Sequence, residues 1–396
     1  MLTQVLTHSQ FSAALRTGHG RALQYVQTFG TTAIDDLLQN ACLNNFVYDS
    51  QSENNRAAWL WQMLQISPQF LQHCSSIIKQ LHITQNDTDL EQLFALTAFC
   101  MQHDIPHAKT VFMQRLQQEY QQKPWAWEGK FGEIRTESDL NTIVEQYAKF
   151  LRQSATDKPD LIPLINVAQT QASVCERIRK DHTVASILQS AAQYKSQYPS
   201  FYTQFGKCAT VEELATIAQR LYASTDPDER LRLLRVFRRV PIPHLELSLF
   251  DDANAPSFEL CTTALQVLAL HQHSRVRKLA LIKLHTGLSA EDDAVIGLLQ
   301  RNYQRGDEQL IQTQLRALNL DEDQRHEWGW TLLNLSKANP DAPLADLLTW
   351  VYEYNPCGGC RASAIKALLH LNALAPALAQ ECLYDANNTV RALVQV

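Results

Sequence analysis

The sequence predicts an all-α protein made of short helices stacked as hairpins. Only 12 glycines occur in 396 residues, and leucine, alanine and glutamine fill long stretches where a strand would alternate valine, isoleucine and threonine. Segments of about 12 to 16 residues place apolar side chains at positions i, i+3, i+4 and i+7, which is the spacing of one helix face. Prolines and short polar clusters separate these segments. We therefore expect helical hairpins joined by short turns, with no significant sheet.

Several helix starts can be placed from their capping residues. Asp226 is expected to cap a helix that begins at Pro227, and Glu229 is positioned to reach back to the cap amide. Thr88 and Thr210 show a related arrangement, because each is followed three residues later by a glutamate. These signals predict helix N-termini close to all three caps.

A short motif recurs in the C-terminal half. Arg277 lies in the segment VRKLALIKL and Arg361 in CRASAIKALL, and each is followed by an alanine three residues later and then by an Ile-Lys pair. A shorter echo, VRALV, contains Arg391. Arg277 and Arg361 lie 84 positions apart, which corresponds to two units of about 42 residues, the length of a helix-pair repeat. An arginine just inside a helix can bridge to the neighbouring repeat.

The stretch from about Asp226 to Val396 resembles HEAT-type repeats of the HEAT and armadillo superfamily. The second helices of such repeats begin with a V-R-x-x-A pattern, which appears here as Val276, Arg277 and Ala280. The resemblance implies a right-handed α-solenoid of HEAT-like helical hairpins. Because helix caps recur along the sequence, we expect about eight to ten helical pairs in the whole chain.

A second echo links the two ends of the chain. YDSQSENNRAA, with Asp49 and Arg56, and YDANNTVRAL, with Asp385 and Arg391, both place Tyr-Asp before an Asn-Asn cap and an arginine. HEAT-type arrays commonly use such residues as a ladder of caps and ion pairs between repeats. We favour this ladder over a catalytic aspartate with an arginine clamp, and expect the N-terminal third to belong to the same array.

Residues 121–160 interrupt the regular pattern. The segment QQKPWAWEGKFGEIR gathers aromatic residues, glycines and a proline, and RQSATDKPD follows the next expected helix. We therefore place a boundary or bend here, with residues 1–155 as an N-terminal helical region of degenerate repeats. Residues 156–396 then form a HEAT-like repeat region continuous with it.

Composition and charge bound the function. The net charge of −6 and the pI near 6.1 argue against a surface built throughout to neutralise phosphates. No run of about 18 apolar residues occurs, and the first residues lack the basic start and apolar core of a secretion signal. We expect a soluble, cytoplasmic protein without membrane contact. The nine cysteines are mostly scattered singly, so no disulfides are expected.

Cys357-Gly358-Gly359-Cys360 is the most distinctive local motif. A C-x-x-C turn can supply two thiolates to zinc, and Cys382 lies downstream with His370 at a separation that a helical turnaround could fold back. The candidate metal ligands are therefore Cys357, Cys360 and Cys382. Redox chemistry is an alternative, because Cys360 stands at a helix N-terminus beside an arginine. A structural turn with ordinary thiols is the favoured interpretation.

The charged residues are unevenly distributed. Residues 230–285 hold nine Lys or Arg against four Asp or Glu, whereas residues 286–354 hold five against twelve. Arg232, Arg235 and Arg239 are expected on the helix face opposite the apolar one. We interpret these three arginines as a partner-binding surface for an acidic partner, with a merely solvated helix face as the alternative.

Three tryptophan pairs have i, i+2 spacing, namely Trp59 with Trp61, Trp125 with Trp127 and Trp328 with Trp330. On a helix such partners point to nearly opposite sides, so one member of each pair is expected in the core and the other partly exposed.

The function most consistent with these features is a non-catalytic scaffold or adaptor that binds a protein or peptide on its concave face. The alternative is a nucleic-acid-acting protein similar to the HEAT-like alkylpurine DNA glycosylases, which the acidic balance disfavours. HEAT-like lyases that attach bilins are a third possibility and would require a pigment pocket.

Overall fold

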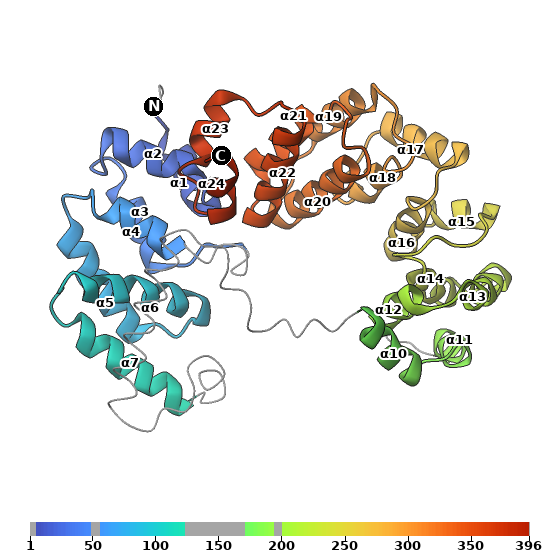
Figure 1. The fold of residues 1–396 in the computed structure, drawn as a ribbon, viewed down its shortest axis with the longest axis horizontal. Helices are drawn as coiled ribbons and strands as arrows, with labels where there is room; N and C mark the ends of the chain where they lie inside the picture. Colours follow the sequence, from blue (N-terminus) through green and yellow to red (C-terminus); the bar gives the residue numbers. More distant parts are fainter. Residues whose placement is uncertain (1–4, 49–55, 123–170, 194–199, 396) are drawn as a thin grey trace. The chain divides into compact units, whose positions relative to one another are not determined.

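The protein is all-helical. The computed structural model describes residues 5–48, 56–122, 171–193 and 200–395, and these contain 22 helices and no strand (Figure 1). The all-α prediction is therefore confirmed. The boundary predicted within residues 121–160 lies almost wholly outside the described residues. The chain divides into two compact units, one of residues 1–161, 355–366 and 373–396, and one of residues 162–354 and 367–372.

The first unit combines helices from both ends of the chain. Its N-terminal helices are α1 (His8–Thr17), α2 (Gly20–Phe29), α3 (Asp35–Leu43), α4 (Arg56–Leu64), α5 (Phe70–Ile83), α6 (Asp87–Gln102) and α7 (Ala108–Gln122). Its C-terminal helices are the first part of α22 (Gly358–His370), α23 (Pro376–Cys382) and α24 (Asn388–Val394). The predicted division had assigned these last helices to residues 156–396, whereas they pack with the N-terminal helices.

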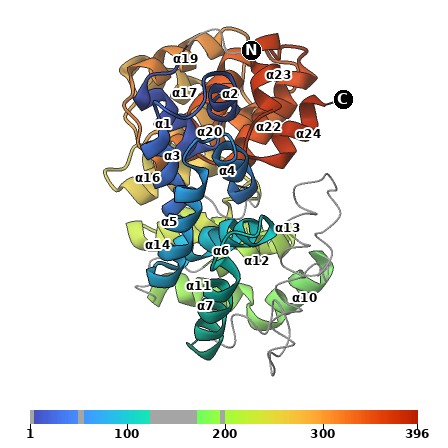
Figure 2. The same ribbon diagram turned by 90° about the vertical axis from the view of Figure 1, so that its left-hand side faces the viewer.

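The helices of the first unit form two rows. Consecutive helices pair, as α1 with α2 and α3 with α4, while α1, α3, α5 and α7 contact one another in sequence, as do α2, α4 and α6. Figure 2 shows the last three of these helices, α5 to α7, together. The core between the rows is apolar and includes the fully buried Phe11, Trp59, Leu60 and Met63.

The C-terminal helices pack directly on the N-terminal ones. α23 lies against α2, where Arg21 Nε donates to Glu381 Oε1 at 2.8 Å (Figure 1). Trp59 Nε1 donates to the Tyr384 carbonyl at 2.8 Å, and the Ala386 amide donates to the Gly18 carbonyl at 2.8 Å. The two ends of the described chain therefore share one core.

The second unit repeats the two-row pattern. Its helices are α10 (Gln171–Asp181), α11 (Val184–Gln193), α12 (Phe201–Cys208), α13 (Val211–Ala223), α14 (Pro227–Val236), α15 (Leu247–Asp252), α16 (Phe258–Leu268), α17 (Ser274–Thr286), α18 (Asp293–Gly297), α19 (Asp307–Ala317), α20 (Glu322–Ala338) and α21 (Ala345–Tyr354). One row runs through α10, α12, α14, α16, α18 and α20. In the other, α11 contacts α13, and α17, α19 and α21 contact one another in sequence.

One expectation about the cysteines is wrong. Cys175 of α10 and Cys208 of α12 form a disulfide, so these adjacent helices of one row are covalently joined. Arg179 of α10 reinforces the junction, because its guanidinium donates to both carboxylate oxygens of Glu213. The spacing of 33 residues gave no local pairing signal, since only the tertiary packing of α10 on α12 brings the two sulfurs together.

Arginine–aspartate pairs connect successive hairpins in both units. Arg277 makes two hydrogen bonds to Asp307, at 2.6 and 2.9 Å, and a third to the Asn302 carbonyl. Arg361 reaches Asp385 at 3.2 Å, and both side chains are completely buried. The bridging role predicted for the two arginines is thus observed. Arg230 makes an equivalent buried pair with Asp252 that the sequence motif did not reveal.

The predicted caps have mixed outcomes. Thr210 and Glu213 form a complete capping box, and Asp226 caps the helix that begins at Pro227. Glu229, however, bonds to Ser224 and Arg220 rather than to the cap amide.

The predicted cap at Thr88 is wrong. Asn86 caps α6 instead, by accepting from the Thr88 amide. Asn86 stands two residues earlier, and asparagine is a stronger N-cap than threonine.

Arg361→Ala is expected to lower stability by about 3 to 5 kcal/mol, because it leaves the Asp385 carboxylate buried without its cation. Arg277→Ala is expected to cost about 1 to 3 kcal/mol, since Arg277 is partly exposed. The control is Arg238→Ala, an exposed arginine bonded to Gln266, with an effect within about 1 kcal/mol. Urea unfolding followed by circular dichroism measures all three, and equal midpoints would refute the assignment.

Gly20→Ala is expected to detach α2 from α23. A Cβ on Gly20 would lie 2.0 Å from the Glu381 carbonyl oxygen, so one backbone must move, at a cost of at least about 2 kcal/mol. Gly297→Ala is the matched control, because the nearest atom to its Cβ is 3.7 Å away. It should leave the urea midpoint unchanged or raise it, through a helix-propensity gain of up to about 1 kcal/mol. A Gly20→Ala protein as stable as wild type would contradict the described contact.

Candidate functional site

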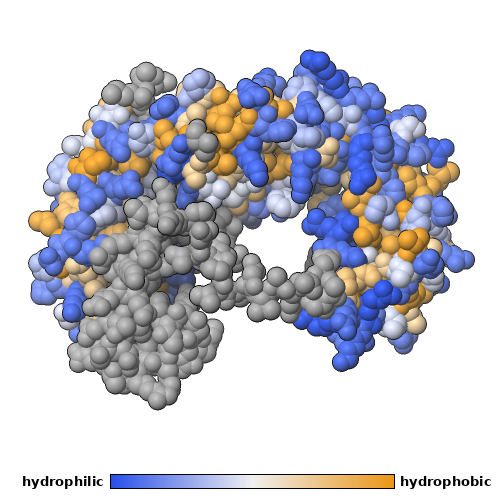
Figure 3. Space-filling model, viewed as in Figure 1, coloured by the Kyte–Doolittle hydropathy of each residue, from blue (hydrophilic) through white to orange (hydrophobic). Residues whose placement is uncertain are grey.

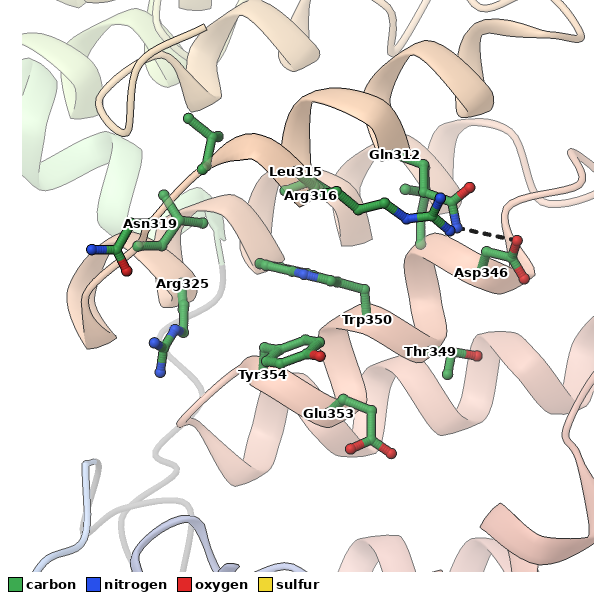
Figure 4. Close-up of a pocket in the computed structure, with 13 residues that line it drawn as sticks. Gln312, Leu315, Arg316, Asn319, Arg325, Asp346, Thr349, Trp350, Glu353 and Tyr354 are labelled. Carbon is green, nitrogen blue, oxygen red and sulfur yellow. Dashed lines mark hydrogen bonds between the residues drawn. The ribbon is translucent and has the colours of Figure 1, made fainter. Parts of the chain in front are cut away.

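The second unit contains a groove of about 640 Å³ between α19 and α21. Gln312, Leu315 and Arg316 stand at i, i+3 and i+4 on one face of α19, and Asn319 follows just beyond its C-terminal end. This face supplies one wall of the groove. Arg325 enters from α20 (Figure 4).

The other wall is one face of α21. Asp346, Trp350, Glu353 and Tyr354 stand at i, i+4, i+7 and i+8, which places them on the same side of the helix. Trp350 and Tyr354 contact each other, with ring centroids 5.6 Å apart and planes inclined by 37° (Figure 4). Tyr354 is 53% exposed, and Trp350 is half-buried. A pair of adjacent aromatic rings therefore opens to solvent inside the groove.

Charged groups of both signs line the groove. Asp346 and Glu353 lie on α21 one turn to either side of Trp350, whereas Arg316 lies on α19 and Arg325 on α20. Gln312 Nε2 donates to Asp346 Oδ2 at 3.2 Å, which links the two walls (Figure 4). Arg316 is exposed, and within the described residues its guanidinium has no hydrogen-bonding partner. The groove thus has its anions on α21, beside the aromatic pair, and its cations on α19 and α20.

The lining of the groove combines an aromatic pair, leucines and charged side chains. Aromatic rings, a few apolar side chains and sparse charged groups are the usual composition of a site that binds and orients a ligand.

The arrangement expected for Arg232, Arg235 and Arg239 is wrong. Arg232 and Arg235 are buried, with Arg232 Nε donating to the Ala191 carbonyl at 2.6 Å and Arg235 contacting Glu259 at 3.5 Å. Arg239 is exposed but lies beyond the end of α14, so the three do not form one helical stripe.

The physical reason lies in the packing of α14. This helix contacts α11, α12, α13 and α16, so nearly its whole circumference is covered. Arginines on its polar side therefore serve to satisfy neighbouring carbonyls and carboxylates. The binding surface must be sought elsewhere.

The predicted metal ligands are only partly brought together. Cys357 and Cys360 stand at the start of α22, both buried, with their Sγ atoms within 4.8 Å of each other and no disulfide between them. Cys382 is buried at the end of α23, but within the described residues it forms no group of three potential ligands with this pair. The third expected ligand is therefore not supported, and zinc binding stays a prediction for the pair alone.

A second constellation, Asp35 with Ser67 and His73, superficially resembles a catalytic triad. Ser67 Oγ donates to Asp35 Oδ1 at 2.8 Å, and His73 Nε2 lies 2.9 Å from Asp35 Oδ2. Ser67 and His73 thus both bind the Asp35 carboxylate rather than each other. All three side chains are buried, with Asp35 at the start of α3 and the other two just before and within the first turns of α5. The group is structural.

The tryptophan pairs behave unequally. Trp328 is fully buried and Trp330 is 47% exposed, as expected, whereas Trp59 and Trp61 are both buried. Trp125 and Trp127 lie outside the described residues. On the face of the second unit visible in Figure 3, hydrophilic and apolar residues are intermixed, so exposed aromatics such as Trp330 do not by themselves define a surface.

Comparison with known proteins identifies no relative. No family model, curated protein or solved structure matches the chain. Among the residues with described structure, no helix combines the length and apolar character needed to cross a lipid bilayer. The groove is accordingly interpreted from its own chemistry.

The groove residues are not among the sites predicted from the sequence. The sequence does contain a signal for them, because Asp346, Trp350, Glu353 and Tyr354 have the spacing of one helical face, and two of these four residues are aromatic. What could not be read from the sequence is that α19 faces α21 across an open space.

Asp35 predicts a pH-dependent stability. Burial raises the pKa of this carboxyl, but the hydrogen bonds that it accepts, foremost from Ser67, outweigh burial and hold the pKa below its usual value of 3.8. Its stabilising effect is therefore complete above pH 3.8 and is lost as the pH falls through the lower folded-state pKa.

Asp35→Asn should cost about 1 to 3 kcal/mol at pH 7, and its urea midpoint should approach that of wild type below pH 3.8. The exposed neighbour Asp36, changed to Asn, is the control and should have little effect at either pH. A constant gap between Asp35→Asn and wild type across this range would contradict the assignment.

Proposed function

We propose that the chain is a HEAT-like α-solenoid that acts as an adaptor, holding a peptide segment of a protein partner in the groove between α19 and α21. The observation that carries the proposal is the solvent-open pair Trp350 and Tyr354 inside that groove. Partly exposed aromatic rings bury a large area on binding at little entropic cost, and they are enriched among the residues that dominate binding energy.

The helix packing supports the solenoid part of the proposal. Each unit has two rows, in which alternate helices contact one another and consecutive helices pair. This is the contact pattern that stacked hairpins produce. The pairs Arg230–Asp252, Arg277–Asp307 and Arg361–Asp385 fit the inter-repeat ladder of HEAT-type arrays.

The walls of the groove support a peptide as the occupant. Its two walls are the side-chain faces of α19 and α21, so an extended or helical segment can lie along them. Its polar groups, including Gln312, Asn319 and Thr349, can bond the backbone of such a segment. The nucleic-acid alternative has less support, because residues 286–354 hold twelve acidic residues against five basic ones.

The proposal is tested by selecting peptides from a random display library on the immobilised full chain. Wild type should enrich peptides that bind in solution, and Tyr354→Ala combined with Trp350→Ala should weaken them by at least about tenfold. Trp330→Ala is the matched control, because Trp330 is exposed on α20 and does not line the groove.

The single variant Tyr354→Ala separates a binding defect from unfolding. It is expected to stay folded, since Tyr354 is exposed and contributes little to the core. It should weaken binding severalfold while leaving the urea midpoint unchanged. Selected peptides that bind equally to wild type and to the groove variants would overturn the proposal, as would a library that yields no binders.

A further inference from the structure

The face of α21 in the groove has the composition of a cation site. Asp346 and Glu353 lie one turn to either side of Trp350, and Tyr354 extends the aromatic surface. A carboxylate on each side of an aromatic platform favours a positively charged group, because the ring face attracts a cation by its quadrupole and the carboxylates pair with it.

Resting on the peptide-binding function proposed above, we infer that the groove selects a basic peptide through an arginine side chain. The guanidinium stacks on Trp350 and Tyr354 and pairs with Asp346 or Glu353. Arginine fits better than lysine, since its planar group stacks on a ring while its edge donates to a carboxylate.

The platform is not already used by the protein. The cation–π contact found within the described residues lies in the first unit, where Arg56 Cζ is 5.8 Å from the centroid of the Trp59 ring. The ring of Trp350 contacts Tyr354 and carries no such cation. Its exposed surface therefore remains open to a ligand.

The surrounding charge also favours a cation. Within the groove, Arg316 and Arg325 balance Asp346 and Glu353, so the wider segment determines the sign of the field. Residues 286–354 carry twelve acidic and five basic side chains, which attracts a basic peptide and repels an acidic one.

Arg316 has a different role in this arrangement. It stands on the opposite wall, exposed and without a hydrogen-bonding partner among the described residues. Its guanidinium is placed to donate to backbone carbonyls of the bound peptide, which would fix the direction in which the peptide lies.

The inference is tested with the peptides selected on the full chain. They should be enriched in arginine, and replacing that arginine by citrulline, a neutral isostere, should weaken binding by about tenfold in fluorescence anisotropy. Lysine at the same position should bind with intermediate affinity. Affinity should fall as salt concentration rises.

Matched variants assign the effect to the two carboxylates. Asp346→Asn combined with Glu353→Gln should lose the preference for arginine over citrulline. Glu327→Gln removes one charge from an exposed position of α20 outside the groove, and it should keep the preference within about twofold. Urea midpoints confirm that each variant remains folded.

The outcomes separate this inference from the function on which it rests. If groove variants abolish binding but citrulline peptides bind as well as arginine peptides, the inference fails and the peptide-binding function stands. Enrichment of acidic peptides whose binding depends on Arg316, or groove-dependent binding of a labelled single-stranded oligonucleotide in place of basic peptides, also overturns it. If the aromatic variants change nothing, the proposed function itself fails.

Discussion

The buried ion pair between Arg361 and Asp385 is the contact on which the arrangement of the first unit depends. Asp385 lies in the turn between α23 and α24, where it also accepts from the Asn387 amide, and Asn387 in turn caps α24. The residues on either side of Asp385 bond to the N-terminal helices. The Tyr384 carbonyl accepts from Trp59 Nε1, and the Ala386 amide donates to the Gly18 carbonyl. Arg361 therefore holds a turn that also contacts α4 and the turn between α1 and α2, and Arg391 donates to the Asp385 and Ala386 carbonyls of the same turn. Two charges withdrawn completely from water are tolerated only with such geometry, since desolvation penalises any alternative placement.

The second unit contains arginine–aspartate pairs of the same kind, and one of them, Arg277–Asp307, is more accessible to water. Arg277 keeps part of its side chain exposed while it makes two bonds to Asp307, and these bonds raise the pKa of the Arg277 guanidinium. Arg230 and Asp252 are nearly as buried as the pair in the first unit. Arg230 of α14 pairs with the last residue of α15, and Arg277 of α17 pairs with the first residue of α19. The pairs therefore specify how helices close in sequence pack on one another. The apolar rows supply most of the stabilising burial, and the ion pairs restrict which stacking is allowed.

Much of the fold was readable in the sequence because it depends on local spacing. The helix-forming composition, the capping box at Thr210 and the arginine motif at Arg277 and Arg361 are each defined within a few residues. The failures share a different cause. Arg232 and Arg235 look solvent-exposed on a helical wheel, but α14 is covered on several sides by helices distant in sequence. The Cys175–Cys208 disulfide, the packing of α23 on α2 and the groove beside Trp350 also arise from tertiary contacts that no local pattern encodes.

The sharing of one core by both ends of the chain has a consequence for biosynthesis. Helices α1 to α4 are synthesised well before the partners of Gly18, Arg21 and Trp59, which lie more than 300 residues later in the chain, at residues 381 to 386. The surface of the N-terminal helices that these residues cover therefore stays exposed while the second unit is synthesised. Contacts separated by more than 300 residues also close slowly, because the loop between them carries a large entropic cost. Translation that stops before residue 381 therefore leaves part of the N-terminal helices uncovered, and chaperones or proteases can recognise that surface.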